Sequence, residues 1–165
     1  MGALSLPVPL ATGHDFDSFC SGEEVLDHWL KRRAWRNEVS GASRTYVVCD
    51  GVAVVGYYAL ATGSAMLDTA PGKVRRNMPD PIPLIILGRL AIDTRYQGMG
   101  LGRGLLKDAL MRSLQVAVQV GVRALLVHAM SEPARQFYLH HGFVVSPLDE
   151  AKLFLPLQGV LAGLS

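Results

Sequence analysis

The chain has 165 residues, a formal net charge of +2, and 50% apolar against 18% charged residues. This length predicts a single domain over residues 1–165, and so apolar a composition excludes an intrinsically disordered chain. The two cysteines, Cys20 and Cys49, are too few for a disulfide scaffold, which favours a reducing compartment such as the cytoplasm. Neither has a metal-ligating neighbour at suitable spacing, so we expect no metal site.

The ends of the chain predict neither a secretory leader nor a membrane span. Residues 1–13 lack a basic segment and contain Pro7 and Pro9. The apolar stretch 153–165 is shorter than the roughly 20 residues that a membrane-spanning helix needs, and Pro156 interrupts it. We expect a final strand there, followed by a tail over residues 158–165.

Charge is unevenly distributed along the chain. Between Lys31 and Arg112 there are 13 basic and six acidic side chains, whereas the rest of the chain has three basic and eight acidic ones. A basic centre is typical of a protein with a polyanionic partner or cofactor. A solvated surface of mixed charge explains the same counts, so charge alone leaves both interpretations open.

The first predicted element is a helix. Ser21 and Glu24 have the spacing of a capping box, in which a hydroxyl and a carboxylate satisfy the first N–H groups of a helix. Apolar residues at helical intervals follow, which predicts a helix over residues 22–36 with a basic end. Cations suit the C-terminus of a helix, so this basic end also has a purely structural explanation.

A hairpin and a long loop are predicted next. Residues 45–49 and 52–61 are rich in Val and Tyr and flank Asp50-Gly51, which is the pattern of two strands joined by a tight turn. Residues 62–83 contain four prolines and no regular apolar pattern. A loop of this length within a compact domain is usually functional or disordered.

The second half of the chain alternates strands and helices. Residues 84–92 form a nearly continuous apolar run, typical of a strand buried on both faces, in which Gly88 indicates a bulge or a close backbone approach. A glycine-rich segment then leads into an amphipathic helix that ends at Gly121. The remaining elements are expected to be a strand at 124–129, a helix at 132–141, and short strands at 144–145 and 153–155. This order predicts an α/β fold, with a mixed sheet in one layer and helices on its faces.

The glycine-rich turn before the long helix carries the clearest chemical signal. Closely spaced glycines let the backbone turn sharply, so that successive N–H groups point toward an anion at the start of a helix, which is a typical phosphate site. Arg95, Arg103 and Lys107 could add positive charge. The segment lacks Gly-Lys-Ser/Thr and its glycines do not fit G-x-G-x-x-G, which excludes a P-loop and argues against a dinucleotide-binding fold.

Two motifs carry a resemblance to a known family. Arg95-Tyr96-Gln97-Gly98-Met99-Gly100 fits R/Q-x-x-G-x-G/A and resembles the acetyl-CoA loop of the GNAT superfamily of N-acetyltransferases. Residues 131–143 resemble the family's N-x-x-A-x-x-F-Y-x-x-x-G-F segment, with Ser131 in place of the usual Asn. The resemblance implies the GNAT fold, a mixed and mostly antiparallel sheet that is splayed at the acetyl-CoA site and has helices on both faces. It also implies the contacts to acetyl-CoA: Leu90, Ala91, Ile92, Gln97, Gly98, Met99, Gly100, Leu101, Gly102, Arg103, Ser131 and Phe137.

In this family an amine attacks the acetyl thioester directly, and the resemblance makes Tyr138 the general acid that protonates the leaving sulfur. The alternative for Tyr138 is a core residue with a satisfied hydroxyl. His128 is a candidate general base, although a core histidine is the more frequent role in a buried strand. His140 and His141 are expected to face solvent or to pack.

A narrower resemblance covers nearly the whole chain up to Pro156. The basic helix and residues 44–49, 75–83 and 137–143 resemble the GNAT toxins of bacterial toxin–antitoxin pairs, which acetylate the amino group of aminoacyl-tRNA and stop translation. The basic residues that could then hold the acceptor stem through phosphate contacts are Lys31, Arg32, Arg33, Arg36, Arg75, Arg76 and Arg89. The resemblance further implies a ribbon-helix-helix antitoxin, operator DNA bound only through the complex with that antitoxin, a homodimer and a cytoplasmic location in bacteria.

Two other functions stay open from the sequence. The acetyl acceptor could be another small amine or a protein N-terminus, although enzymes for cationic substrates usually place acidic groups where this chain is basic. The chain could also be a non-catalytic acyl-CoA-binding or regulatory module, which the presence of Tyr138 argues against. An amine next to an ester is less basic than a lysine side chain, so more of it is neutral at physiological pH. That property fits an aminoacyl-tRNA acceptor.

Overall fold

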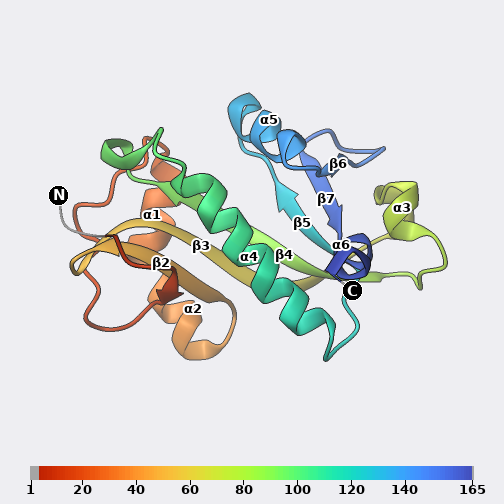
Figure 1. Cartoon of the computed structure of the whole chain (residues 1–165), viewed down its shortest axis with the longest axis horizontal. Helices are drawn as coiled ribbons and strands as arrows, with labels where there is room; N and C mark the ends of the chain where they lie inside the picture. The colour runs from red at the N-terminus through yellow and green to blue at the C-terminus, as the bar shows by residue number, and fades with distance from the viewer. Residues whose placement is uncertain (1–3, 165) are drawn as a thin grey trace. The chain divides into compact units, whose positions relative to one another are not determined.

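The computed structural model describes residues 4–164, with side chains up to residue 160. Figure 1 colours the chain from its N-terminus to its C-terminus and labels helices α1–α6 and strands β2–β7. The bounds of the elements are as follows: β1 Val8–Pro9, α1 Glu24–Arg32, α2 Ala34–Ser40, β2 Arg44–Asp50, β3 Ala53–Ala65, η1 Leu67–Thr69, α3 Gly72–Arg75, β4 Ile82–Ile92, η2 Thr94–Tyr96, α4 Leu101–Ala117, β5 Ala124–His128, α5 Glu132–His140, β6 Val144–Val145, β7 Lys152–Pro156 and α6 Leu157–Leu164.

The strands are ordered β1-β2-β3-β4-β5-β7-β6 in a seven-stranded sheet. β4 and β5 pair in parallel, from Leu84 opposite Ala124 to Leu87 opposite Val127. The pairs β1–β2, β2–β3, β5–β7 and β6–β7 are antiparallel. The sheet is therefore mixed, as the order of elements predicts, and mostly antiparallel, as the family resemblance implies.

The chain divides into two compact units, and β3, β4 and α4 each contribute residues to both. The first unit comprises residues 1–61 and 88–109, and the second comprises residues 62–87 and 110–165.

The core of the first unit is built around Tyr57 of β3. Its ring stacks on Trp29 of α1 with centroids 5.9 Å apart and meets Phe19 edge-on at 5.6 Å. Its hydroxyl donates a hydrogen bond to the carbonyl oxygen of Leu26 at 2.6 Å. Leu30, one turn further along α1, is fully buried. The apolar face of α1 is thus fixed on the hairpin both by packing and by one hydrogen bond to its backbone.

The second unit has its own apolar core. α3 and α5 contact β7, and α6 contacts β5. Val74 is the buried residue of the short helix α3. A buried cluster joins α3 to β4, β5 and β7, and it comprises Ala70, Val74, Ile82, Leu84, Ala124 and Phe154.

The predicted capping box at Ser21 is wrong. The helix begins at Glu24, and its N-cap residue Glu23 makes no side-chain cap. The hydroxyl of Ser21 accepts from the N–H of Glu23 at 3.1 Å, and it donates to Oδ1 of Asp27 at 2.6 Å. The same carboxylate oxygen accepts from the N–H of Ser21 at 2.9 Å. The serine therefore pairs with a carboxylate inside the helix, one turn later than the capping-box spacing requires.

The predicted single helix over residues 22–36 is also wrong, because the chain forms two helices. Arg33 separates α1 from α2 with a φ of −119°, outside the helical range. The hydrogen bonds continue across the break, from the N–H of Arg33 to Trp29 and from the N–H of Asn37 to Arg33. The basic residues predicted on one helix end are therefore divided between two helices.

Three boundaries differ from the sequence prediction. The irregular stretch predicted over 62–83 is partly ordered, because β3 continues to Ala65 and α3 forms within it. α4 ends at Ala117 rather than at Gly121, although the N–H groups of Val118 and Val120 still donate to carbonyl oxygens four residues earlier. The segment predicted as a tail forms α6, whose first residue Leu157 is fully buried.

Among residues 4–164, no helix combines the length and the apolar character that crossing a bilayer requires.

Replacing Leu30 tests the core of the first unit. Leu30→Ala leaves a cavity at a fully buried position, so we expect the free energy of unfolding to fall by about 2–5 kcal/mol in a denaturant titration. Val25→Ala is the matched control on the same helix, because Val25 is 56% exposed, and it should change stability by less than about 0.5 kcal/mol. Equal effects of the two substitutions would contradict this packing of α1.

Candidate active site

The turn between β4 and α4 has the backbone conformation that its glycines predict. Gly98 and Gly100 have φ angles of +80° and +83°, which L-residues with a Cβ rarely adopt. A Cβ at either position would have no neighbour within 4 Å, so packing does not explain these glycines. Their role is to let the backbone turn.

The turn leads into α4 and leaves the first amides of the helix outside its hydrogen-bond pattern. The N–H of Gly104 donates to the carbonyl oxygen of Gly100 at 3.1 Å, which is the first hydrogen bond of the helix. The N–H groups of Leu101, Gly102 and Arg103 precede that bond, and in the described part of the chain they are the unpaired donors that a helix N-terminus leaves. These donors and the helix dipole make the turn suitable for a diphosphate.

Two side chains brace this turn against the segment that precedes α1. The side-chain amide of Gln97 donates to the carbonyl oxygens of Ser21 and Ile92, at 2.9 Å each. Asp93, only 1% exposed, accepts from the N–H groups of Cys20 and Arg95. The side chain of Gln97 therefore shapes the turn, and the cofactor contact predicted for this residue would have to come from its backbone.

Arg95 is held by Asp93, although the sequence suggests it as a phosphate ligand. Its Nε and Nη2 donate to the two carboxylate oxygens of Asp93 at 3.0 and 3.2 Å. Burial alone would raise the pKa of Asp93, but the hydrogen bonds from Arg95 and from the Cys20 N–H lower that pKa below its ordinary value. The carboxylate therefore stays charged. The guanidinium of Arg95 is engaged by Asp93, so its first role is to hold the turn rather than to contact a ligand.

An open hollow of about 680 Å³ lies beside α1 in the first unit, and we call it the α1 pocket. Apolar side chains and both signs of charge line it, from the following residues: Phe19, Cys20, Glu24, Val25, Asp27, His28, Trp29, Lys31, Arg33 and Arg89. The sequence analysis missed both aromatic residues here, because Trp29 at helical spacing predicts core packing alone and Phe19 lies outside the predicted helix.

Arg89 of β4 is the most constrained cation of the α1 pocket. Its guanidinium lies over the ring of Trp29, 5.5 Å from the centroid, and its Nη1 donates to the carbonyl oxygen of Gly88 at 3.0 Å. Its Nε is buried without a hydrogen-bond partner among the described residues. Arg89 is half-buried, so it differs from the surface cation that the sequence predicts.

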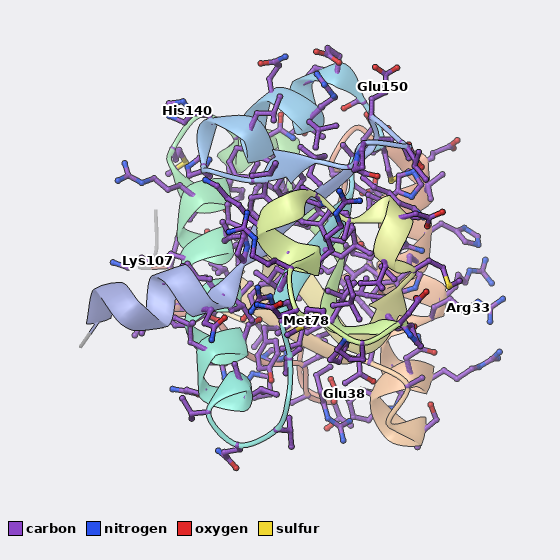
Figure 2. The ribbon with its side chains drawn as sticks, turned by 90° about the vertical axis from the view of Figure 1, so that its right-hand side faces the viewer. Arg33, Glu38, Met78, Lys107, His140 and Glu150 are labelled. Carbon is purple, nitrogen blue, oxygen red and sulfur yellow. The ribbon has the colours of Figure 1, made fainter. Side chains whose placement is uncertain are left out.

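The other predicted cations of the first unit are exposed. Figure 2 shows the side chain of Arg33 pointing away from the ribbon, and Lys31, Arg32 and Arg36 are exposed as well. Of this group, Lys31 and Arg33 line the α1 pocket.

Tyr138 of α5 is buried, at 7% exposure, between two aromatic rings of the second unit. Its centroid lies 5.2 Å from that of Phe137 and 5.2 Å from that of Phe143, both in edge-to-face geometry. Burial raises the pKa of the Tyr138 phenol above its ordinary value near 10. The phenol is therefore protonated at neutral pH, which is the form that a general acid needs.

Ser131 is the N-cap of α5, where its Oγ accepts from the N–H of Ala134 at 3.2 Å. This contact leaves its hydroxyl proton available to a ligand. His141 packs on Phe137, and its Nδ1 lies 2.8 Å from the carbonyl oxygen of that residue. His140 is exposed and projects outward (Figure 2). Both histidines thus behave as predicted.

His128 corrects one sequence interpretation. It is the last residue of β5 and is exposed, so the core role that is more frequent for such a histidine is wrong. Its role as a general base stays a prediction.

The predicted site residues divide between the two units. The glycine turn, Leu90–Ile92 of β4 and the cations of α1, α2 and Arg89 belong to the first unit. Tyr138, Phe137, Ser131 and the exposed pair Arg75 and Arg76 belong to the second. Among residues 4–160, no three His, Cys, Asp or Glu side chains form a group that could hold a metal ion.

Comparison with known proteins assigns the family. The model of the acetyltransferase (GNAT) domain matches residues 41–145. This chain belongs to the GNAT acetyltransferase family. A protein of Mycobacterium tuberculosis (strain ATCC 25618 / H37Rv) named tRNA-acetylating toxin is 49% identical over 162 residues, which cover 98% of each chain. The probable toxin TacT of Sinorhizobium fredii (strain NBRC 101917 / NGR234) is 29% identical over 89% of this chain and 87% of its own.

Solved structures of GNAT toxins are similar over the whole chain. The structure of AtaT complexed with acetyl-methionyl-tRNAfMet matches with a TM-score of 0.91 and 29% identity, covering 99% of this chain and 100% of that one. A variant of AtaT with one tyrosine replaced by phenylalanine, bound to the C-terminus of the antitoxin AtaR and acetyl-CoA, matches at 0.82 and 29%, covering 97% of each chain. The AtaT–AtaR complex bound to DNA matches at 0.75 and 30%, covering 99% of each chain.

Replacing Gly100 tests the turn. Gly100→Ala puts a Cβ on a left-handed residue, at a cost of about 1–3 kcal/mol, so we expect acetyl-CoA to bind at least about fivefold more weakly in isothermal titration calorimetry. The control is Gly121→Ala, because Gly121 has no left-handed φ and a Cβ there meets nothing within 4 Å. Unchanged affinity in the Gly100 variant would show that the turn does not shape the coenzyme site.

Proposed function

We propose that this GNAT acetyltransferase is a toxin that transfers the acetyl group of acetyl-CoA to the α-amino group of aminoacyl-tRNA and thereby blocks translation. The observation that carries the proposal is the 49% identity, end to end, with the tRNA-acetylating toxin of Mycobacterium tuberculosis. The geometry of the glycine turn and the protonated Tyr138 supply the chemistry that such a reaction needs.

The residues present fit acetyl-CoA as the acetyl donor. The unpaired amides of Leu101–Arg103 and the open turn at Gly98 and Gly100 suit its diphosphate. We propose that backbone groups of Leu90–Ile92 hold the pantetheine arm like an added strand and that Ser131 and Phe137 complete the contacts. Acetyl-CoA supplies an activated acyl thioester.

We propose that Tyr138 donates its phenolic proton to the departing sulfur. A buried phenol with a raised pKa keeps that proton across the physiological range. The α-amine of an aminoacyl ester is already partly neutral at pH 7, so a strong base is not required, and exposed His128 is the candidate to take the proton that the amine loses.

The acceptor would be held by charge and by the α1 pocket. The exposed cations Lys31, Arg32, Arg33, Arg36, Arg75 and Arg76 offer phosphate contacts that position the tRNA without reading its sequence. Arg89 directly precedes Leu90–Ile92, so the α1 pocket adjoins the strand segment proposed for the pantetheine arm. We therefore propose that this pocket receives the aminoacyl end.

The protein would act within a toxin–antitoxin system in the bacterial cytoplasm. AtaT is solved with the C-terminus of its antitoxin AtaR and, as the AtaT–AtaR complex, with DNA. By analogy we propose a cognate antitoxin of the ribbon-helix-helix type, operator binding through the complex, and a homodimeric toxin.

One observation favours a second candidate, the acetylation of a small cationic amine. The α1 pocket contains the carboxylates of Glu24 and Asp27, which could receive a positive charge. One oxygen of Asp27 is already engaged by Ser21, and three cations line the same pocket, so the aminoacyl-tRNA is the stronger candidate.

The deciding experiment incubates the purified protein with acetyl-CoA and charged tRNA, digests the RNA and identifies the 3′-terminal adenosine esters by mass spectrometry. The proposal expects N-acetyl-aminoacyl-adenosine, formed only with acetyl-CoA. Acetylation of a polyamine or of a peptide N-terminus, with the charged tRNA unchanged, would support the second candidate instead.

Replacing Tyr138 by phenylalanine keeps the ring and removes the proton. We expect kcat for aminoacyl-tRNA to fall by about 100- to 10,000-fold, with acetyl-CoA affinity within about twofold of wild type. Because burial raises the pKa of Tyr138, wild-type kcat should show no loss from tyrosine ionisation up to about pH 10. The measurements are steady-state kinetics between pH 6 and 10, and near-normal turnover of the variant would refute the role as acid. AtaT and KacT have both been solved as tyrosine-to-phenylalanine variants, the same chemical change.

A further inference from the structure

The short helix α3 ends with carbonyl groups that its own backbone does not satisfy. The N–H of Arg76 donates to Gly72 and the N–H of Met78 donates to Arg75, both at 3.1 Å. Asn77 has a φ of +61°, which stops the helix. The carbonyl oxygens of Lys73 and Val74 are thus left at the end of a four-residue helix, a length that is unstable alone in water.

The guanidinium of Arg123, the residue directly before β5, donates hydrogen bonds to these carbonyl oxygens. Nε of Arg123 donates to the carbonyl oxygen of Val74 at 2.9 Å. Its Nη2 donates to the carbonyl oxygens of Lys73 at 3.2 Å and of Arg76 at 3.4 Å. An arginine near a helix C-terminus both satisfies the last carbonyls and complements the dipole, and here it comes from 47 to 50 residues away in the sequence.

Arg123 is itself firmly held. Its backbone N–H donates to the carbonyl oxygen of Pro83 at 2.9 Å, and its backbone carbonyl oxygen accepts from the N–H of Leu157 at 3.1 Å. Its Nη1 donates to the side-chain oxygen of Gln158 on α6. Because β4, β5 and α6 fix the backbone around Arg123, its guanidinium can impose a position on α3.

We propose that Arg123 is a positioning residue that presents Arg75 and Arg76 together to the phosphates of the tRNA. This inference rests on the proposed function. The side chains of Arg75 and Arg76 are exposed, while the backbone that carries them is tied to Arg123. Without the hydrogen bonds from Arg123, segment 72–77 would have to become ordered when RNA binds. The entropy lost in that ordering would weaken RNA binding.

Arg123 acts through its neighbours rather than on RNA directly. Its hydrogen bonds to four protein oxygens engage Nε, Nη1 and Nη2, so the guanidinium is committed to the protein. The salt slope is the slope of the logarithm of the RNA association constant against the logarithm of the salt concentration. Losing a single direct phosphate contact reduces its magnitude by about one unit, whereas losing the joint presentation of two arginines reduces it by about two.

The experiment measures tRNA affinity against salt concentration for Arg123→Gln, for Arg75→Gln/Arg76→Gln, and for all three changes combined. We expect Arg123→Gln to weaken binding about tenfold and to lower the salt slope by about two units, as the double variant does. The triple variant should bind no more weakly than the double variant, because coupled residues are not additive.

Arg135→Gln is the matched control. Arg135 also donates from its guanidinium to a backbone carbonyl oxygen, that of Glu150, but neither residue belongs to α3. It should leave the salt slope of the wild type unchanged. If Arg123→Gln does not fold, as judged by thermal unfolding, Arg123→Lys takes its place, because a lysine keeps the charge and loses the fork that reaches three carbonyls.

Additive losses in the triple variant, or a slope change near one, would overturn the positioning role. Unchanged affinity in Arg123→Gln would overturn it too. Failure of the proposed function gives a different result, because the wild-type protein would then neither bind nor acetylate aminoacyl-tRNA.

Discussion

The proposed coenzyme site depends on one backbone constraint, the turn that joins β4 to α4. Two residues of left-handed conformation, Gly98 and Gly100, let the chain leave the strand and enter the helix with unpaired amides at its start. The turn is not held by packing around the glycines. It is held by Gln97 and Asp93, whose side chains bond to the backbone on both sides of it. The proposed diphosphate site would thus use backbone dipoles that need no reorganisation.

The two substrates would be held by different kinds of charge. The proposed coenzyme site uses fixed dipoles, which suit a ligand that always has the same diphosphate. The proposed tRNA surface uses long cationic side chains, which tolerate different sequences. Two of those cations are held in place by other parts of the protein. Arg89 is half-buried over Trp29, and Arg76 has its backbone tied by Arg123. The proposed tRNA surface would therefore be partly preorganised, like the proposed coenzyme site.

The sequence predicts the chemistry of this protein better than its local boundaries. The sharp glycine turn, the mixed sheet and the GNAT family are confirmed, because positive-φ glycines and buried apolar runs leave strong local patterns. The capping box at Ser21 is wrong because Asp27, which offers a carboxylate at helical spacing, competes for the same serine. No local pattern marks that competition.

Long-range contacts explain the remaining differences. Residues 62–83 are read as a loop because the partner that stabilises α3, Arg123, lies about 50 residues further along the chain. Arg89 is read as a surface cation because its partner Trp29 is distant in sequence. The burial of Leu157, which starts α6, likewise follows from tertiary contacts with β5 and not from helix propensity. Sequence periodicity contains none of these pairings.

Titration calorimetry that compares acetyl-CoA with acetyl-pantetheine, which carries the same thioester but lacks the diphosphate and the 3′-phosphoadenosine attached to it, tests the central claim most directly. If the amides after Gly100 hold the diphosphate, acetyl-CoA should bind at least about 100-fold more tightly, because charge-assisted hydrogen bonds contribute about 1.5–3 kcal/mol each. Equal binding of the two thioesters, or no binding of either, would contradict it.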